Sequence, residues 1–114
     1  LGDVYKRQDP NRIYTGFGVF SHIPLLKGGL DYFRKNNRYN DWDSKNPKET
    51  LIEYVVEKNG KASHVSIKES SGNAELDQEA IRLIKEAEYT VAKLKNGKEA
   101  RAGGMMINVT FPTK

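Results

Sequence analysis

Few residues of this chain have the types and spacing that catalysis or metal binding would need. Its two histidines, His22 and His64, are far apart, and His64 lies on the opposite face of a strand-like segment from Val65 and Ile67. Cysteine is absent, so the chain has neither a thiolate nucleophile nor a thiolate zinc ligand. The histidines are therefore interpreted as ordinary packing or surface residues. We expect no catalytic residue, no cofactor and no metal site.

Two short motifs could in principle support ligand chemistry. Asp41 and Asp43 flank Trp42 and could form a carboxylate pair for acid–base catalysis, but their polar surroundings lack the burial that would raise a carboxyl pKa. Ser70-Ser71-Gly72 could bind an anion at a helix N-terminus, although acidic residues that follow already occupy this positive end. We therefore interpret Asp41 and Asp43 as polar loop residues and Ser70-Ser71-Gly72 as part of the helix cap.

Tyrosines and basic residues together raise the alternative of nucleic-acid binding. The net charge is +4, and residues 89–114, with five basic residues and one acidic residue, account for all of it. Four tyrosines could stack on bases: Tyr32, Tyr39, Tyr54 and Tyr89. No RNA-binding signature accompanies them. A basic single-domain nucleic-acid-binding protein is therefore the alternative function, and a small enzyme ranks below it.

Length and composition predict one small folded domain. The chain has 114 residues, of which 37% are hydrophobic and 30% are charged. No apolar run approaches the about 20 residues of a membrane-spanning helix. We interpret residues 1–22 as a flexible leader, with residues 1–8 a non-native remnant, and residues 23–114 as the domain. Any targeting or anchoring segment is expected upstream of Leu1.

The first half of this domain is predicted to contain a helix and a hairpin. Gly28-Gly29 followed by Leu30 and Phe33 predicts a short amphipathic helix over residues 30–36, and a polar loop then extends to residue 48. Residues 51–56 are β-branched and aromatic, which predicts a buried strand. Asn59-Gly60 predicts a tight hairpin turn with positive φ at both central residues, and residues 62–69 alternate as the return strand.

The second half is predicted to contain a helix and a strand. Asn73 is a good N-cap, and four apolar residues recur at helical spacing over about 14 residues: Leu76, Ala80, Ile84 and Ala87. Residues 105–111 alternate between apolar and mixed side chains and end at Pro112, which predicts a third strand.

This order of elements predicts an α+β fold with a three-stranded antiparallel sheet of order 2-1-3 and two helices on one face. Residues 105–111 then form an edge strand with an unpaired row of backbone groups. The expected core consists of Ile52, Tyr54, Val56, Val65, Ile67, Leu76, Ala80, Ile84, Ile107 and Val109.

The ordered combination of motifs resembles the C-terminal domain of TonB energy transducers, in the form found in Bacteroidota-type bacteria. The resemblance spans residues 23–111 and departs from the usual family pattern at Tyr39-Asn40, residues 89–92 and Gly97-Lys98-Glu99. Its motifs are Gly28-Gly29-Leu30, Tyr39, residues 55–61, Val65-Ser66-Ile67-Lys68, Ser70-Ser71-Gly72, Leu76-Asp77, Ala80-Ile81, Ile84, Asn96-Gly97-Lys98 and residues 107–111.

The resemblance implies an αββαβ fold of the TonB/TolA type and a periplasmic, energy-transducing role in nutrient uptake. In such proteins the edge strand pairs with a segment of an outer-membrane TonB-dependent receptor. An upstream anchor in the inner membrane contacts an ExbB/ExbD-type motor. A homodimer through the edge strand is the other possible pairing, and no nucleic acid is expected. The implied partner-binding residues are Tyr39, Asn40, Met106, Ile107, Asn108, Val109 and Thr110.

Overall fold

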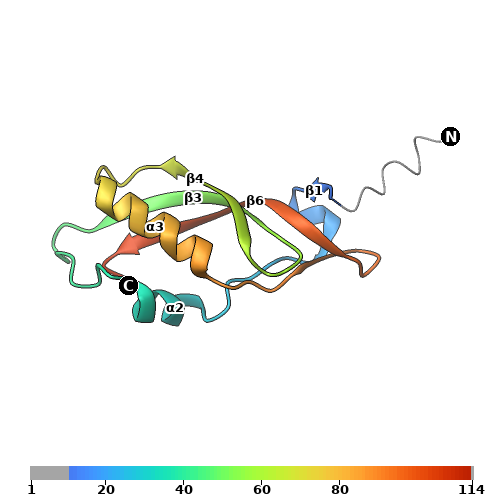
Figure 1. Cartoon of the computed structure of the whole chain (residues 1–114), viewed down its shortest axis with the longest axis horizontal. Helices are drawn as coiled ribbons and strands as arrows, with labels where there is room; N and C mark the ends of the chain where they lie inside the picture. Colours follow the sequence, from blue (N-terminus) through green and yellow to red (C-terminus); the bar gives the residue numbers. More distant parts are fainter. Residues whose placement is uncertain (1–10, 114) are drawn as a thin grey trace.

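The computed structural model describes residues 11–113, and these form two α-helices, one 3-10 helix and six strands (Figure 1). The expectations for residues 1–8 lie outside the described residues. In chain order the elements are β1 (Ile13–Tyr14), η1 (Phe17–Val19), β2 (Phe20–His22), α2 (Gly29–Asn36), β3 (Lys48–Val56), β4 (Ala62–Glu69), α3 (Ala74–Glu86), β5 (Ala92–Leu94) and β6 (Glu99–Phe111).

The sheet has the order β2-β5-β6-β3-β4, and β1 pairs with β6 in parallel. The α+β class and the order of the three predicted strands, now β4-β3-β6, are confirmed. The prediction of only three strands is wrong, because β1, β2 and β5 add to the sheet. These strands are two or three residues long, too short to show a period of two in the sequence. Residues 13–22, expected to belong to a flexible leader, carry two of them.

The β3–β4 hairpin turns at Asn59-Gly60, as expected, but with a different turn. Within residues 11–113, His64 is the one non-glycine residue with positive φ, so the predicted left-handed conformation of Asn59 is wrong. The turn closes through hydrogen bonds from Glu57 N to Lys61 O (2.8 Å) and from Gly60 N to Glu57 O (2.9 Å). His64 (φ 49°) lies where the β3–β4 register shifts, so the strand pair contains a bulge.

Helix α3 begins after Asn73, as predicted. The Asn73 side chain accepts hydrogen bonds from the backbone N–H groups of Glu75 (2.9 Å) and Leu76 (3.2 Å). This satisfies two of the donors that every helix N-terminus leaves unpaired. The apolar stripe of α3 is fully buried against the sheet at Leu76, Ala80, Leu83 and Ile84.

The main core lies between α3, α2 and strands β3 and β6. Seven predicted core residues are confirmed as buried: Ile52, Tyr54, Val56, Leu76, Ala80, Ile84 and Val109. Val65 and Ile107 are half-buried. The prediction for Ile67 is wrong, because its side chain is 40% exposed. Ile67 pairs with the buried Ile52 but lies on β4, the outermost strand, where one side of the residue faces solvent.

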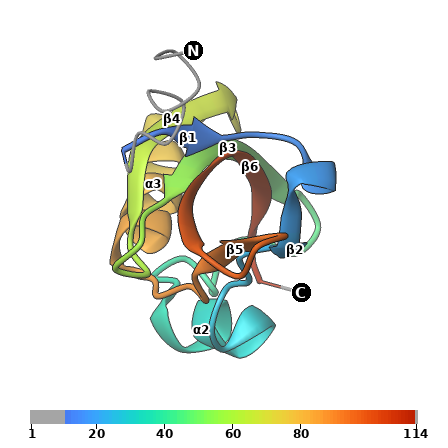
Figure 2. The ribbon, with the colours of Figure 1, turned by 90° about the vertical axis from the view of Figure 1, so that its right-hand side faces the viewer.

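A second, smaller core lies at the β2–β5 end of the sheet. Its buried members come from β2, β5 and β6: Phe20, Ala92, Ala100 and Ala102. Figure 2 shows the strong curvature that brings β5 and β2 round toward the side of α2. Met105 packs against both cores and so links them.

Candidate functional site

The candidate site is the side of β6 that faces away from β3. On the β3 side, β6 pairs in antiparallel register from Ala102, opposite Val56, to Phe111, opposite Lys48. Strand β5 pairs only with Glu99 and Ala100, and β1 pairs only with residues 101–102. Among residues 11–113, no strand other than β3 pairs with residues 103–111. We call the unpaired side of this stretch the open edge.

The side chains along the open edge alternate between the core and solvent. Val109 and Phe111 are buried, whereas Met106 is 55% exposed and Asn108 is exposed. Ile107 and Thr110 are half-buried. The solvent face is therefore polar apart from Met106, and within residues 103–111 the edge carries neither a charge nor a proline to block pairing.

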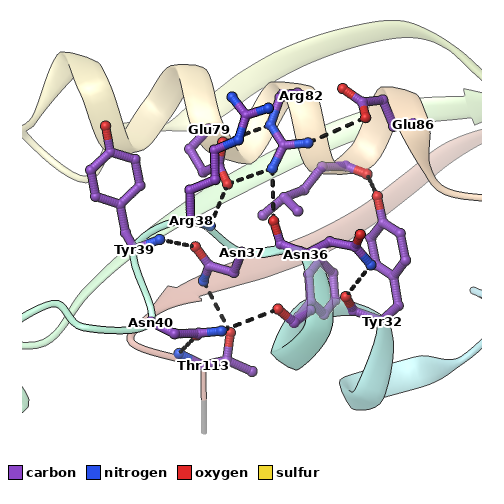
Figure 3. A network of polar contacts seen from close by, with 12 residues as sticks. Tyr32, Asn36, Asn37, Arg38, Tyr39, Asn40, Glu79, Arg82, Glu86 and Thr113 are labelled. Atoms are coloured by element: carbon purple, nitrogen blue, oxygen red, sulfur yellow. Dashed lines mark hydrogen bonds and ion pairs between the residues drawn. The ribbon is translucent and has the colours of Figure 1, made fainter.

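The loop after α2 closes the C-terminal end of the open edge (Figure 3). Asn37 is buried, and its side-chain amide donates to the Thr110 carbonyl (3.3 Å) and to Thr113 Oγ1 (3.0 Å). The Asn40 side-chain oxygen accepts from the backbone N–H of Thr113 (3.0 Å). The last residues of the sheet are thus bound to a loop more than seventy positions earlier in the chain.

The same loop is fixed to α3 by a buried acid and an arginine. The Glu79 carboxylate accepts from Arg38 N (2.8 Å) and from the Arg82 guanidinium (2.7 Å), and Arg82 also donates to the Asn36 carbonyl (2.8 Å) (Figure 3). Burial acts to raise the pKa of Glu79, but these hydrogen bonds and the Arg82 charge outweigh it and lower that pKa. The hydrogen bond to Glu79 raises the pKa of Arg82. Both groups are therefore charged at neutral pH.

Tyr39 lies at the same end of the strand. Its ring meets the Phe111 ring edge-on, with 6.4 Å between the ring centroids, and its hydroxyl donates to the Glu75 carboxylate (3.4 Å). Desolvation and the Glu75 charge raise the pKa of Tyr39, so the hydroxyl remains a donor at neutral pH. The structure thus brings Tyr39 and Asn40 beside the end of residues 106–110, the strand segment expected to bind a partner.

The residues that hold this loop were not predicted from the sequence. They are Asn37, Glu79 and Arg82, of which Glu79 and Arg82 have the i, i+3 spacing of a helical ion pair. This spacing is the one signal in the sequence that could have identified them. The amide of Asn37 gave no signal, because its acceptors are distant in the chain.

The other motifs have structural roles. Ser70 and Ser71 donate to the buried carboxylate of Asp77, so they stabilise the start of α3 and do not face an open anion site. Trp42 packs on the main core. Among residues 11–113, no three side chains of the His, Cys, Asp or Glu types gather as a metal site would require. No helix in this part of the chain has the length and apolar character needed to cross a membrane.

Comparison with known proteins adds one match. A family model described as "Gram-negative bacterial TonB protein C-terminal" matches residues 49–113, which run from β3 to the end of the described chain. Searches of curated proteins and of solved structures found no match.

Proposed function

Because the chain belongs to the family of Gram-negative bacterial TonB protein C-terminal domains, we propose that the open edge of β6 is its receptor-binding surface. Family membership gives the chain a TonB-type energy-transducing role in the periplasm. The family is transport-associated and non-enzymatic, and its members interact with outer-membrane receptors.

The observation that carries the proposal is that residues 103–111 have one strand neighbour instead of two. An edge strand binds an extended peptide through main-chain hydrogen bonds, and side-chain contacts then select the sequence. A receptor segment would add beside β6 as a further strand. Its side chains would meet Met106 and Asn108 on the solvent face, with Tyr39 and Asn40 at the end of the strand.

A hydrogen bond from Asn37 indicates which backbone groups of β6 point toward the open edge. Asn37 lies outside the sheet and donates to the Thr110 carbonyl. The backbone groups of residues two apart in a strand point to the same side. Met106 and Asn108 would therefore direct their backbone N–H and C=O groups to the open edge. Because Asn37 already donates to the Thr110 carbonyl, the incoming strand would end its pairing before that group.

An energy transducer also needs a connection to its energy source. We propose that a segment upstream of this chain anchors it in the inner membrane and contacts an ExbB/ExbD-type motor. A second copy of the chain is the competing occupant of the open edge, because an unpaired edge can also pair with itself.

The proposal is tested with Asn108→Pro, and Asn108→Ser is the matched control. Proline removes the N–H at position 108, whereas serine keeps it. The measurement is calorimetric titration with N-terminal segments of outer-membrane receptors, with circular dichroism as the check on folding. We expect the proline variant to lose binding while it remains folded, and the serine variant to bind.

Hydrogen exchange provides the independent check. We expect the amides of residues 106 and 108 to exchange rapidly in the free protein and to be protected when the receptor segment is bound. Protection of both amides in the free monomer would contradict the proposal, because the open edge would then be paired within the chain.

A further inference from the structure

A second surface lies between β2 and β5, away from the open edge. Here residues 21–25 and 90–93 line an open groove of about 650 Å³ whose exposed surface is mostly apolar. Ile23 and Leu25 line it and remain 41% and 60% exposed. Exposed apolar side chains that gather in one groove are a feature of interaction sites.

The walls of this groove are fixed by hydrogen bonds. Leu25 N donates to Thr90 Oγ1 (2.8 Å), and Thr90 N donates back to the Leu25 carbonyl (2.8 Å). Ser21 Oγ donates to the Leu94 carbonyl (2.8 Å). These bonds hold the two segments side by side, so the surface that exposes Ile23 and Leu25 is a fixed part of the fold.

The groove also lies in the most basic part of the chain. Lys93 lines it, and Lys95 and Lys98 lie in the turn between β5 and β6. None of these three lysines forms an ion pair within residues 11–113, and Glu99 is the one acidic residue in the lining. Lys93 lies directly opposite Glu99 in the β5–β6 pair, so the charges of these two lining residues offset each other, and Lys95 and Lys98 make the surroundings of the groove net positive. A net positive charge beside an apolar surface favours a ligand that is both apolar and anionic.

We propose that this β2–β5 groove binds an extended segment of a partner protein in which apolar residues alternate with acidic residues. Ile23 and Leu25 are exposed on either side of the buried Pro24, and this spacing matches every second side chain of an extended peptide. The acidic side chains of the segment would meet Lys93, Lys95 and Lys98. A second copy of the chain would bring the same cations and be repelled, and a flat membrane surface would not fill a groove.

The test uses the whole chain and a fluorescent synthetic octapeptide in which valine and glutamate alternate, with fluorescence anisotropy as the readout. Leu25→Glu places a negative charge in the groove, and we expect it to weaken binding by roughly tenfold or more. Leu30→Glu is the matched control, because Leu30 is 51% exposed on α2 and does not line the groove. It should bind as the unchanged chain does.

Two further variants separate the possible explanations. Lys93→Glu should weaken binding and reduce its dependence on salt, since it reverses one of the proposed contact charges. Asn108→Pro separates the two surfaces: octapeptide binding that persists in this variant takes place away from the open edge, whereas binding that it abolishes takes place at the open edge and would overturn the groove proposal. Failure of the groove proposal is thus distinguishable from failure of the receptor proposal.

The inference would be overturned by no binding of the octapeptide, equal binding of a valine–lysine octapeptide, unchanged binding by Leu25→Glu, or binding to phosphatidylglycerol vesicles in place of the peptide. Self-association that Leu25→Glu abolishes would also overturn it, because a second copy would then be the occupant. Circular dichroism of each variant shows whether the fold is kept.

Discussion

The carboxylate of Asp77 is buried below the loop that precedes α3, where it accepts hydrogen bonds from three side chains and one backbone amide. The donors include Thr50 Oγ1 (2.7 Å), Ser71 N (2.9 Å) and Ser71 Oγ (2.8 Å), and Ser70 Oγ is the fourth. Burial acts to raise the pKa of Asp77, but these hydrogen bonds outweigh it and lower that pKa. A single ionised side chain thus joins β3, the loop and α3.

We expect Asp77→Asn to lower the free energy of unfolding at pH 7 by about 1–3 kcal/mol, since hydrogen bonds to a charged group are lost. The folded-state pKa lies below the unfolded value of about 3.9, so this contribution is present above that value. It is lost as the pH falls through the folded-state pKa. Urea unfolding from pH 7 to pH 3 should show the two proteins converging at low pH.

Asp41→Asn is the control for this pH dependence, because Asp41 is exposed in the loop before β3. It should change the unfolding free energy little at any pH. A difference between Asp77→Asn and the unchanged chain that stays constant down to pH 3 would contradict the role given to the charge.

Two isoleucines differ sharply in burial, so we expect their truncation to alanine to lower the free energy of unfolding by different amounts. Ile84 is fully buried on α3, so we expect Ile84→Ala to destabilise the fold by about 2–5 kcal/mol. Ile67 is 40% exposed on β4, and Ile67→Ala should cost about 1 kcal/mol or less. Chemical denaturation of both variants measures the difference. Equal costs would mean that the burial of these two residues differs from that described here.

At the scale of the elements, the strongly periodic segments were predictable and the short ones were not. Strand β4 has the predicted bounds, and α3 follows its predicted N-cap, because each carries several residues of one period. Strand β2 is defined by its pairing with β5, through pairs such as Phe20 and Leu94, which no local pattern reveals. The open edge followed from the hairpin and the helical crossover. The hydrogen bond by which Asn37 closes the end of the open edge could not be predicted in this way, because it depends on the conformation of the loop after α2.

The β3–β4 turn also contacts the segment after α3, through a position that only glycine fits. Gly60 has φ +79°, and a Cβ atom there would lie 2.9 Å from the Tyr89 carbonyl oxygen, which is a backbone atom. The Gly60 carbonyl in turn accepts from Tyr89 N (2.9 Å). The turn and the segment after α3 therefore hold each other in place.

We expect Gly60→Ala to destabilise the fold by about 2 kcal/mol or more, since it combines left-handed backbone strain with a clash against backbone. Gly97→Ala is the matched control: Gly97 has φ +84°, but nothing lies within 4 Å of an added Cβ. It should cost about 1 kcal/mol, from the backbone conformation alone. Thermal unfolding of the two variants tests the contact with Tyr89, and equal losses would show that this contact contributes nothing.

At the scale of the whole molecule, one continuous sheet carries two cores of unequal size. The main core joins both α-helices to the strands that the family model matches, whereas the smaller core needs Phe20 from β2, which precedes the match. The open edge of β6 lies along the main core, and the β2–β5 groove lies at the small one. The two proposed binding surfaces therefore depend on different parts of the packing.

Phe20→Ala tests whether the two cores unfold separately. Phe20 is the one large side chain among the buried members of the small core. Its truncation to alanine should therefore lower the free energy of unfolding of that core by about 3–5 kcal/mol. We expect hydrogen exchange to become faster in β5 and residues 99–102, while the slowest amides of α3 keep their protection. Ile84→Ala, in the main core, should instead speed exchange throughout the chain. If Phe20→Ala lowers the protection of α3 as much as that of β5, the molecule is one cooperative unit. Partner binding at either surface would then stabilise both cores, whereas with separate units it would stabilise mainly its own.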